Sequence, residues 1–149
     1  MIKIICLGNI KEDYLKEAIK EYQKRLSKYT KLEIIELKDE KDTSNPLKKE
    51  KDNIIKHIND KDNLILLDIK GKQLTSEEFA VFINKELTTH SNITFVIGSS
   101  NGLDEEIKQL TKKKISFSLL TFPHQLFRVI LLEQIYRSFK MLNNETYHK

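Results

Sequence analysis

Three short, mainly apolar runs constrain the fold of this chain more than any other feature. They are residues 2–7 (IKIICL), 64–69 (LILLDI) and 93–97 (ITFVI). The second and third runs lack the alternation of a strand with one wet face, so they predict strands buried on both faces, as in a parallel sheet. After the first run, apolar side chains recur every three or four residues, which indicates a helix over residues 12–29.

The same pattern continues along the whole chain. It predicts two more strands at residues 32–37 and 115–119, and four more helices at residues 46–58, 75–87, 103–110 and 123–142. A polar, mobile loop over residues 38–53 runs into the second helix. Such alternation implies an α/β fold, with a mainly parallel sheet and helices on both of its faces. The 149 residues show no internal repeat and suit a single domain over residues 1–149.

Composition excludes several classes of protein. With 39% apolar residues and 32% charged residues of mixed sign, the chain is expected to be globular rather than disordered. No apolar run approaches the roughly 18 residues of a membrane span, and the N-terminal run is too short and too soon charged for a signal peptide. The single cysteine, Cys6, is either a small core residue or a catalytic thiol. These features favour a cytoplasmic protein, and the histidines show no metal-ligand spacing.

Positive charge is concentrated towards the C-terminus. Residues 107–149 carry eight Lys or Arg against two Asp or Glu, whereas residues 1–106 carry 18 against 20. This distribution indicates either a polyanionic partner such as nucleic acid or a solvated, lysine-rich surface. The last three residues, Tyr147, His148 and Lys149, suit stacking on a base and contact with phosphate, although a terminal tail is also often frayed.

Three loops after the later strands are candidates for a ligand site, because ligands of open α/β sheets bind beyond the carboxyl ends of the strands. The loops read KGKQLT, GSSNG and LLTFPH. GSSNG matches neither G-x-G-x-x-G nor G-x-x-x-x-G-K-[ST], which disfavours a standard dinucleotide or triphosphate site. On spacing alone it is either an ordinary turn or a ligand loop. Asp68, before the first of these loops, is either a site carboxylate or a local hydrogen-bond acceptor.

The last predicted helix, QLFRVILLEQIYRSFKML, is apolar around most of its circumference. A helix on a protein surface normally has one apolar stripe. This helix must therefore contact the sheet and a second apolar surface. A second copy of the chain would supply that surface, which predicts a homodimer; the alternative is a helix sunk in its own core.

Four segments occur together in one order: LDIKGK, FVIGSSNGL, SFSLLTFPHQLFRVILLEQIYRSFK and a terminal TYHK. In combination they closely resemble the ribosomal large-subunit methyltransferase H (RlmH) family of the SPOUT superfamily. The resemblance extends from end to end and is weakest over residues 38–53. It implies an α/β-knot fold, in which the C-terminal chain passes through a loop to form a trefoil knot, and an enzyme that acts as a homodimer.

The resemblance also implies an activity and a cofactor site. Proteins of this family use S-adenosylmethionine to methylate N3 of a pseudouridine in 23S ribosomal RNA, on the large subunit or the assembled ribosome, without a membrane or a metal. By position, the methyl donor is expected to lie against Leu67, Gly98, Gly102, Phe117, Ser118, Leu119, Leu120, Thr121 and Phe122. The family usually has a second glycine where this chain has Ser99, and a serine at positive φ would cost about 1 kcal/mol.

Three residues are expected to carry the chemistry, and each has a structural alternative. A sulfonium methyl is already activated, so positioning supplies much of the catalysis, while the N3 proton requires a base or a stabilised anion. His148 is the candidate base or proton shuttle, and Tyr147 is expected to stack on or position the uracil ring. Arg128 is expected to stabilise charge on a uracil carbonyl or to hold a phosphate. In a dimer, the tail of one subunit would complete the site of the other.

Two other functions remain open on the sequence. A non-catalytic RNA-binding α/β domain would keep the fold and lack the methyl-donor pocket, so donor binding separates it from the enzyme. A general nucleotide binder of the flavodoxin or dehydrogenase kind lacks its fingerprint here and gives the terminal residues no role.

Overall fold

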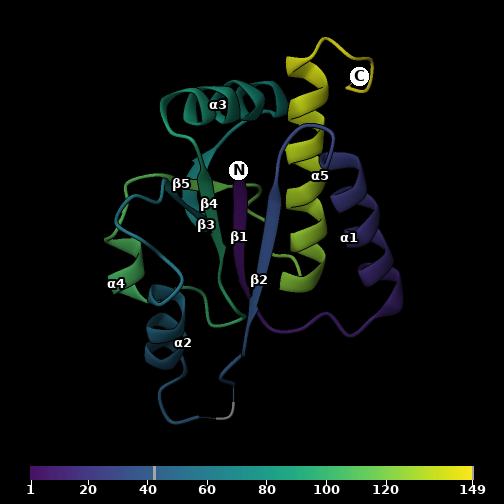
Figure 1. The fold of residues 1–149 in the computed structure, drawn as a ribbon. Coiled ribbons are helices and arrows are strands. Elements are labelled where there is room, and N and C mark those ends of the chain that lie inside the picture. The colour runs from purple at the N-terminus through teal and green to yellow at the C-terminus, as the bar shows by residue number, and fades with distance from the viewer. Residues whose placement is uncertain (42, 149) are drawn as a thin grey trace.

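The computed structural model describes residues 1–41 and 43–148 (Figure 1). Lys149, the predicted phosphate contact at the end of the tail, lies outside the described residues. Strands and helices alternate as the sequence predicts. They are β1 (Ile2–Leu7), α1 (Asp13–Leu26), β2 (Leu32–Leu37), α2 (Pro46–Ile55), β3 (Leu64–Gln73), α3 (Ser76–Thr89), β4 (Ile93–Ile97), α4 (Glu105–Lys108), β5 (Lys114–Ser116) and α5 (His124–Leu142).

The strands form one sheet in the order β2-β1-β4-β3-β5. Every neighbouring pair in this sheet is parallel, which confirms the predicted α/β fold with a parallel sheet. Because all strands point the same way, their carboxyl ends lie at one end of the sheet, and the loops after β3, β4 and β5 meet there.

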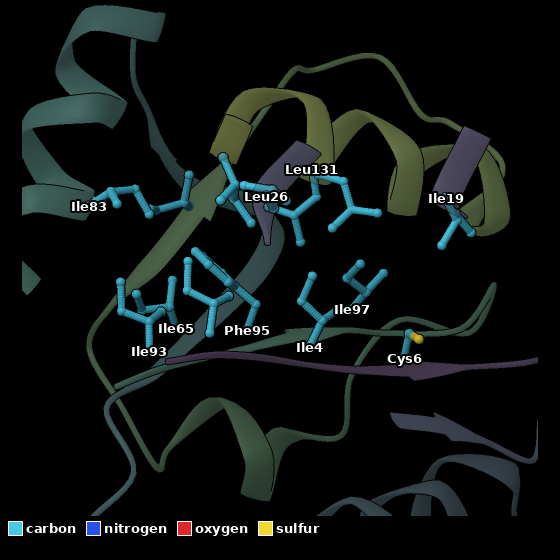
Figure 2. Packing of buried hydrophobic residues seen from close by; sticks show 14 of the residues in the cluster. Ile4, Cys6, Ile19, Leu26, Ile65, Ile83, Ile93, Phe95, Ile97 and Leu131 are labelled. Carbon is cyan, nitrogen blue, oxygen red and sulfur yellow. The ribbon is translucent and has the colours of Figure 1, made fainter. Parts of the chain in front are cut away.

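Helices cover both faces of the sheet, as predicted (Figure 1). On β1, Ile4 and Cys6 point into the core beneath α1, α3 and α5, whereas Ile5 and Leu7 point into a second core beneath α2 and α4. Figure 2 shows the first of these cores, with side chains of the sheet facing Leu131 of α5. This alternation follows from the two-residue period of a strand.

Cys6 is a core residue. It is fully buried, and burial raises the pKa of its thiol to about 12. A thiol with that pKa is not ionised near neutral pH, and a thiolate is the reactive form. The catalytic alternative for Cys6 is therefore wrong for this structure.

The long helix α5 lies along the sheet between α1 and α3 (Figure 1). Its residues Leu131, Leu132 and Ile135 are fully buried. On another side of the helix, the ring of Tyr136 packs edge-on against Tyr22, at a centroid distance of 6.2 Å. Much of the apolar circumference of α5, on which the predicted dimer rests, is thus covered by side chains of the same chain.

Two strand boundaries differ from the prediction. β3 continues to Gln73, beyond the predicted end at residue 69, because Lys72 and Gln73 pair again with β5. β5 is shorter than predicted and ends at Ser116, because the following residues leave the sheet. Both differences lie where the candidate ligand loops meet.

Within the described residues no helix has the length and apolar character needed to cross a membrane. In the same part of the chain, no three His, Cys, Asp or Glu side chains gather as ligands for a metal ion.

Candidate active site

A cavity of about 470 Å³ opens at the carboxyl ends of β3, β4 and β5. We call it the strand-end cavity. Its walls come from the three loops that the sequence singles out. Eight of the nine residues expected to contact the methyl donor line it: Leu67, Gly98, Gly102, Phe117, Ser118, Leu120, Thr121 and Phe122. Leu119 does not line it and is 76% exposed.

The first wall is the glycine loop, residues 98–102. The N–H of Gly102 donates to the carbonyl of Ser99 at 2.9 Å, which closes a tight turn, and Gly102 has a φ of +81°. A Cβ on Gly98 would lie 2.6 Å from the Gly102 carbonyl oxygen, so a side chain there would force the loop apart. GSSNG is therefore both a turn and a wall of the cavity.

Ser99 does not have the backbone strain that the family resemblance suggested. In the described residues, positive φ occurs at Gly8, Gly102 and Asn144, and not at Ser99. A serine costs no extra backbone free energy outside the left-handed region. The expected penalty of replacing a glycine at this position is therefore absent.

The second wall is a bulge in β3. Leu67 and Lys72 both pair with Ile115 of β5, so the residues between them are displaced from the ladder. A Cβ on Gly71 would lie 2.6 Å from the Ile115 nitrogen, so only glycine allows this approach of the two strands. The sequence interpretation took this segment as a loop and missed Gly71, although a glycine inside a strand often marks a bulge.

Asp68 lies in this bulge and lines the strand-end cavity. Its Oδ1 accepts a hydrogen bond from the N–H of Lys70 at 3.1 Å. Of the two alternatives for Asp68, the local acceptor is confirmed, and the position at the cavity leaves its carboxylate available to a ligand.

The third wall is the 117–122 loop. The Phe117 ring packs edge-on between Phe79 and Phe127, at centroid distances of 5.4 and 5.1 Å. The hydroxyl of Ser118 accepts a hydrogen bond from the N–H of Leu120 at 2.9 Å. Aromatic packing and this local bond hold the loop in place.

His124, the first residue of α5, also lines the strand-end cavity. Its Nε2 is buried without a hydrogen-bond partner in the described residues. Burial lowers the pKa of His124, so the ring is neutral near pH 7. The sequence interpretation gave His124 no role, and its only signal was the position at the start of the last helix.

Known proteins with similar sequences indicate the family to which this chain belongs. A family model described as "Predicted SPOUT methyltransferase" matches residues 1–148. The ribosomal RNA large subunit methyltransferase H of Caldicellulosiruptor saccharolyticus is 50% identical over 154 residues, which cover 100% of both chains. The protein of the same name from Clostridium botulinum is 55% identical over 157 residues, and the putative one from Methanococcus maripaludis is 51% identical over 157 residues; each match covers 99% of both chains.

The chain belongs to the RlmH family of SPOUT methyltransferases. Because each match covers nearly the whole of both proteins, the membership extends to the strand-end cavity and to the tail.

In this RlmH family member, the structure does not bring Arg128 to the strand-end cavity. Arg128 is 1% exposed. Its NH1 lies 2.7 Å from Oε2 of Glu36, and its NH2 donates to the carbonyl of Gly8 at 3.0 Å. Within the chain Arg128 therefore ties α5 to the ends of β1 and β2, which is its structural alternative.

The C-terminal tail, residues 143–148, packs on the rest of its own chain. The Tyr147 hydroxyl donates to Oε1 of Glu133 at 3.0 Å. The ring nitrogens of His148 lie 2.6 Å from Oε1 of Glu77 and 3.1 Å from NH1 of Arg137. Neither Tyr147 nor His148 lines the strand-end cavity of the same subunit. The frayed-tail alternative thus does not describe these two side chains, and the structure does not join them to the methyl-donor residues.

Proposed function

We propose that this protein transfers a methyl group from S-adenosylmethionine to N3 of a pseudouridine in 23S ribosomal RNA, in the cytoplasm and as a single domain. One observation carries the proposal: the strand-end cavity is lined by eight of the nine residues at which the family resemblance places the methyl donor. The names of the relatives support large-subunit ribosomal RNA as the substrate class.

The residues of the strand-end cavity fit such a methyl donor. Its volume of about 470 Å³ lies within the usual range of small-molecule sites. Leu67, Ile97 and Phe117 supply apolar wall for an adenine ring. Gly98 leaves a cradle that a Cβ would fill. The Asp68 carboxylate suits a ligand that carries positive charge.

The work of the protein in this proposal is mainly positioning. When bound, the sulfonium of S-adenosylmethionine supplies an activated methyl group. The glycine loop and the 117–122 loop hold the ligand through backbone groups, and the apolar side chains of the 117–122 loop exclude water. Arg128, buried and paired, acts by fixing the start of α5 rather than by touching the base.

In this proposal the Nδ1 of His148 exchanges its contact with Arg137 for the base and accepts the N3 proton, and Tyr147 positions the base. Because neither lines the cavity of its own subunit, the proposal places the tail of a second copy there, in a knotted homodimer. The apolar side chains beside the cavity support a subunit contact, since Leu119 and Leu120 are 76% and 73% exposed. A contact at these leucines would cover them and bring two subunits together at the site.

The non-catalytic RNA-binding alternative rests on Ser99 and on the basic C-terminal part of the chain. Ser99 lies in the wall of the cavity without positive φ, so it does not argue against donor binding. The basic part suits an enzyme that acts on RNA as well as a binding domain.

The proposal is tested by the modified nucleosides of 23S ribosomal RNA. Cells that lack this protein are expected to lose N3-methylated pseudouridine, and a plasmid copy of the wild-type gene is expected to restore it. Mass spectrometry of nucleoside digests measures both. Retention of the modification in the deletion strain would refute the proposed substrate, provided that no second copy of the gene is present.

A further inference from the structure

A buried carboxylate lies behind the glycine loop, outside the strand-end cavity. Glu50 of α2 is 2% exposed. The Ser99 hydroxyl donates to its Oε1 at 2.9 Å, and its Oε2 is buried without a hydrogen-bond partner in the described residues. The neighbouring Lys51 pairs with Asp52 and Glu106 and not with Glu50.

A carboxylate in such a place is costly. Removing a charge from water is unfavourable unless a cation or several hydrogen bonds compensate. Burial raises the pKa of Glu50, hydrogen bonding to Ser99 and Asn101 opposes that rise, and the charges of Asp39 and Glu40 add to it. An amide or apolar side chain would fill the same space at lower cost, so the carboxylate indicates a role other than packing.

The contacts of Glu50 lead to the turn that forms the cavity wall. The Ser99 hydroxyl that donates to Glu50 also accepts a hydrogen bond from the N–H of Asn101 at 3.2 Å. The carbonyl of Ser99 accepts the N–H of Gly102 at 2.9 Å. The Glu50 carboxylate therefore fixes the Ser99 hydroxyl, and that hydroxyl fixes the middle of the glycine loop through the N–H of Asn101.

We propose that Glu50 is a positioning residue for the methyl-donor site, which acts through the Ser99 hydroxyl to hold the glycine loop against the strand-end cavity. The identity of the ligand in this proposal rests on the proposed function, whereas the effect of Glu50 on the conformation of the glycine loop does not. When Glu50 is ionised, its hydrogen bond from Ser99 is roughly twice as strong as a neutral one, and the charge then adds to the restraint.

The restraint on the glycine loop affects ligand binding, because any movement of this loop changes the shape of the strand-end cavity. The position of a Cβ on Gly98 is already 2.6 Å from the Gly102 carbonyl oxygen. A turn that opens at Ser99 moves Gly98 and Gly102 relative to each other, and both line the cavity. A loop held in its binding conformation before the ligand arrives loses less entropy on binding.

The first test measures the affinity for S-adenosylmethionine by calorimetry. Glu50→Ala and Ser99→Ala are each expected to weaken binding about tenfold, the equivalent of one hydrogen bond to a charged group. The double variant is expected to bind no more weakly than either single variant, because both remove the same restraint. Glu50→Gln keeps an acceptor for Ser99 and is expected to lose only about threefold. Asp52→Ala, on the same helix and half exposed, is the matched control and should bind normally.

The second test uses amide hydrogen exchange of the ligand-free protein. Exchange at Asn101 and Gly102 is expected to speed up in Glu50→Ala and Ser99→Ala, and to stay unchanged in Asp52→Ala. If the wild type does not bind S-adenosylmethionine, the proposed function fails, and the exchange rates still decide whether Glu50 holds the loop.

Unchanged exchange at Asn101 and Gly102 in both single variants would overturn the proposal, and so would unchanged affinity for S-adenosylmethionine in both. It would also be overturned if the losses of binding free energy in the two single variants added up in the double variant. If Glu50→Ala fails to fold, Glu50→Gln and Ser99→Ala are compared with the wild type in the same two measurements. If Glu50 were merely structural, Glu50→Gln would change the melting temperature without changing the affinity, which is also contrary to the proposal.

Discussion

The guanidinium of Arg128 lies 2.7 Å from the carboxylate of Glu36, and the two side chains come from α5 and β2. The arginine side chain is 1% exposed and that of Glu36 is 41% exposed. This ion pair joins the start of the last helix to the edge strand of the sheet. The 117–122 loop, which lines the strand-end cavity, precedes that helix.

We expect Arg128→Ala to lower the free energy of unfolding by about 1.5–3 kcal/mol, because the buried guanidinium loses its hydrogen bonds to Glu36 and Gly8 while the Glu36 carboxylate left behind is partly exposed. Urea unfolding of the wild type and the variant measures the difference. Arg25→Ala is a useful control, because Arg25 forms a helical i,i+4 pair with Glu21 whose two side chains are 40% and 51% exposed. A variant of unchanged stability that lost methyl transfer would show instead that Arg128 acts on the substrate.

Gly98→Val is expected to abolish binding of S-adenosylmethionine and to leave the protein folded. The valine Cβ would lie 2.6 Å from the Gly102 carbonyl oxygen, so the glycine loop must shift into the cavity or away from it. Calorimetry gives the affinity, and circular dichroism checks the fold. Normal affinity in a folded variant would refute the assignment of this loop to the methyl-donor site.

Deletion of residues 147–149 is expected to remove methyl transfer and to leave the affinity for S-adenosylmethionine within about twofold of the wild type, since a twofold change is below 0.5 kcal/mol. The reason is that Tyr147 and His148 contact α5 and α3, not the strand-end cavity of their own subunit. Turnover on ribosomes and calorimetry measure the two effects. Undiminished turnover would remove the tail from the mechanism.

The pH dependence of stability provides a prediction for Glu50. Its pKa is raised above the ordinary value of 4.5, so in the window above pH 4.5 the folded state binds more protons than the unfolded state. Stability from this group therefore falls as pH rises through that window, and the penalty is absent below it. Glu50→Gln removes the group, so its stability relative to the wild type is expected to increase from pH 4 to pH 7. Parallel stability curves would contradict the raised pKa.

The sequence predicted the sheet well because its strands are buried on both faces. Ile65 and Phe95 are fully buried, and runs that contain such residues carry a strong local signal. The extension of β3 had no such signal. It depends on the close approach of Gly71 to Ile115, a contact between residues distant in the chain.

The sequence predicted the loops of the cavity but not the residues that support the site from behind. The cavity loops carried glycines and a family pattern, so most of their residues were named in advance. Glu50 was not, because it stands in the charged segment KKEKDN, which is typical of a solvated helix face. The partner of Arg128 was equally hidden, because Glu36 is 92 residues away in the chain.

The most direct measurement is transfer of labelled methyl from S-adenosylmethionine to ribosomes purified from cells that lack this protein, with wild type and Gly98→Val compared. The account predicts label in a pseudouridine of the large-subunit RNA with the wild type and none with the variant. A folded wild-type protein that leaves no label, or equal label from both proteins, would contradict it.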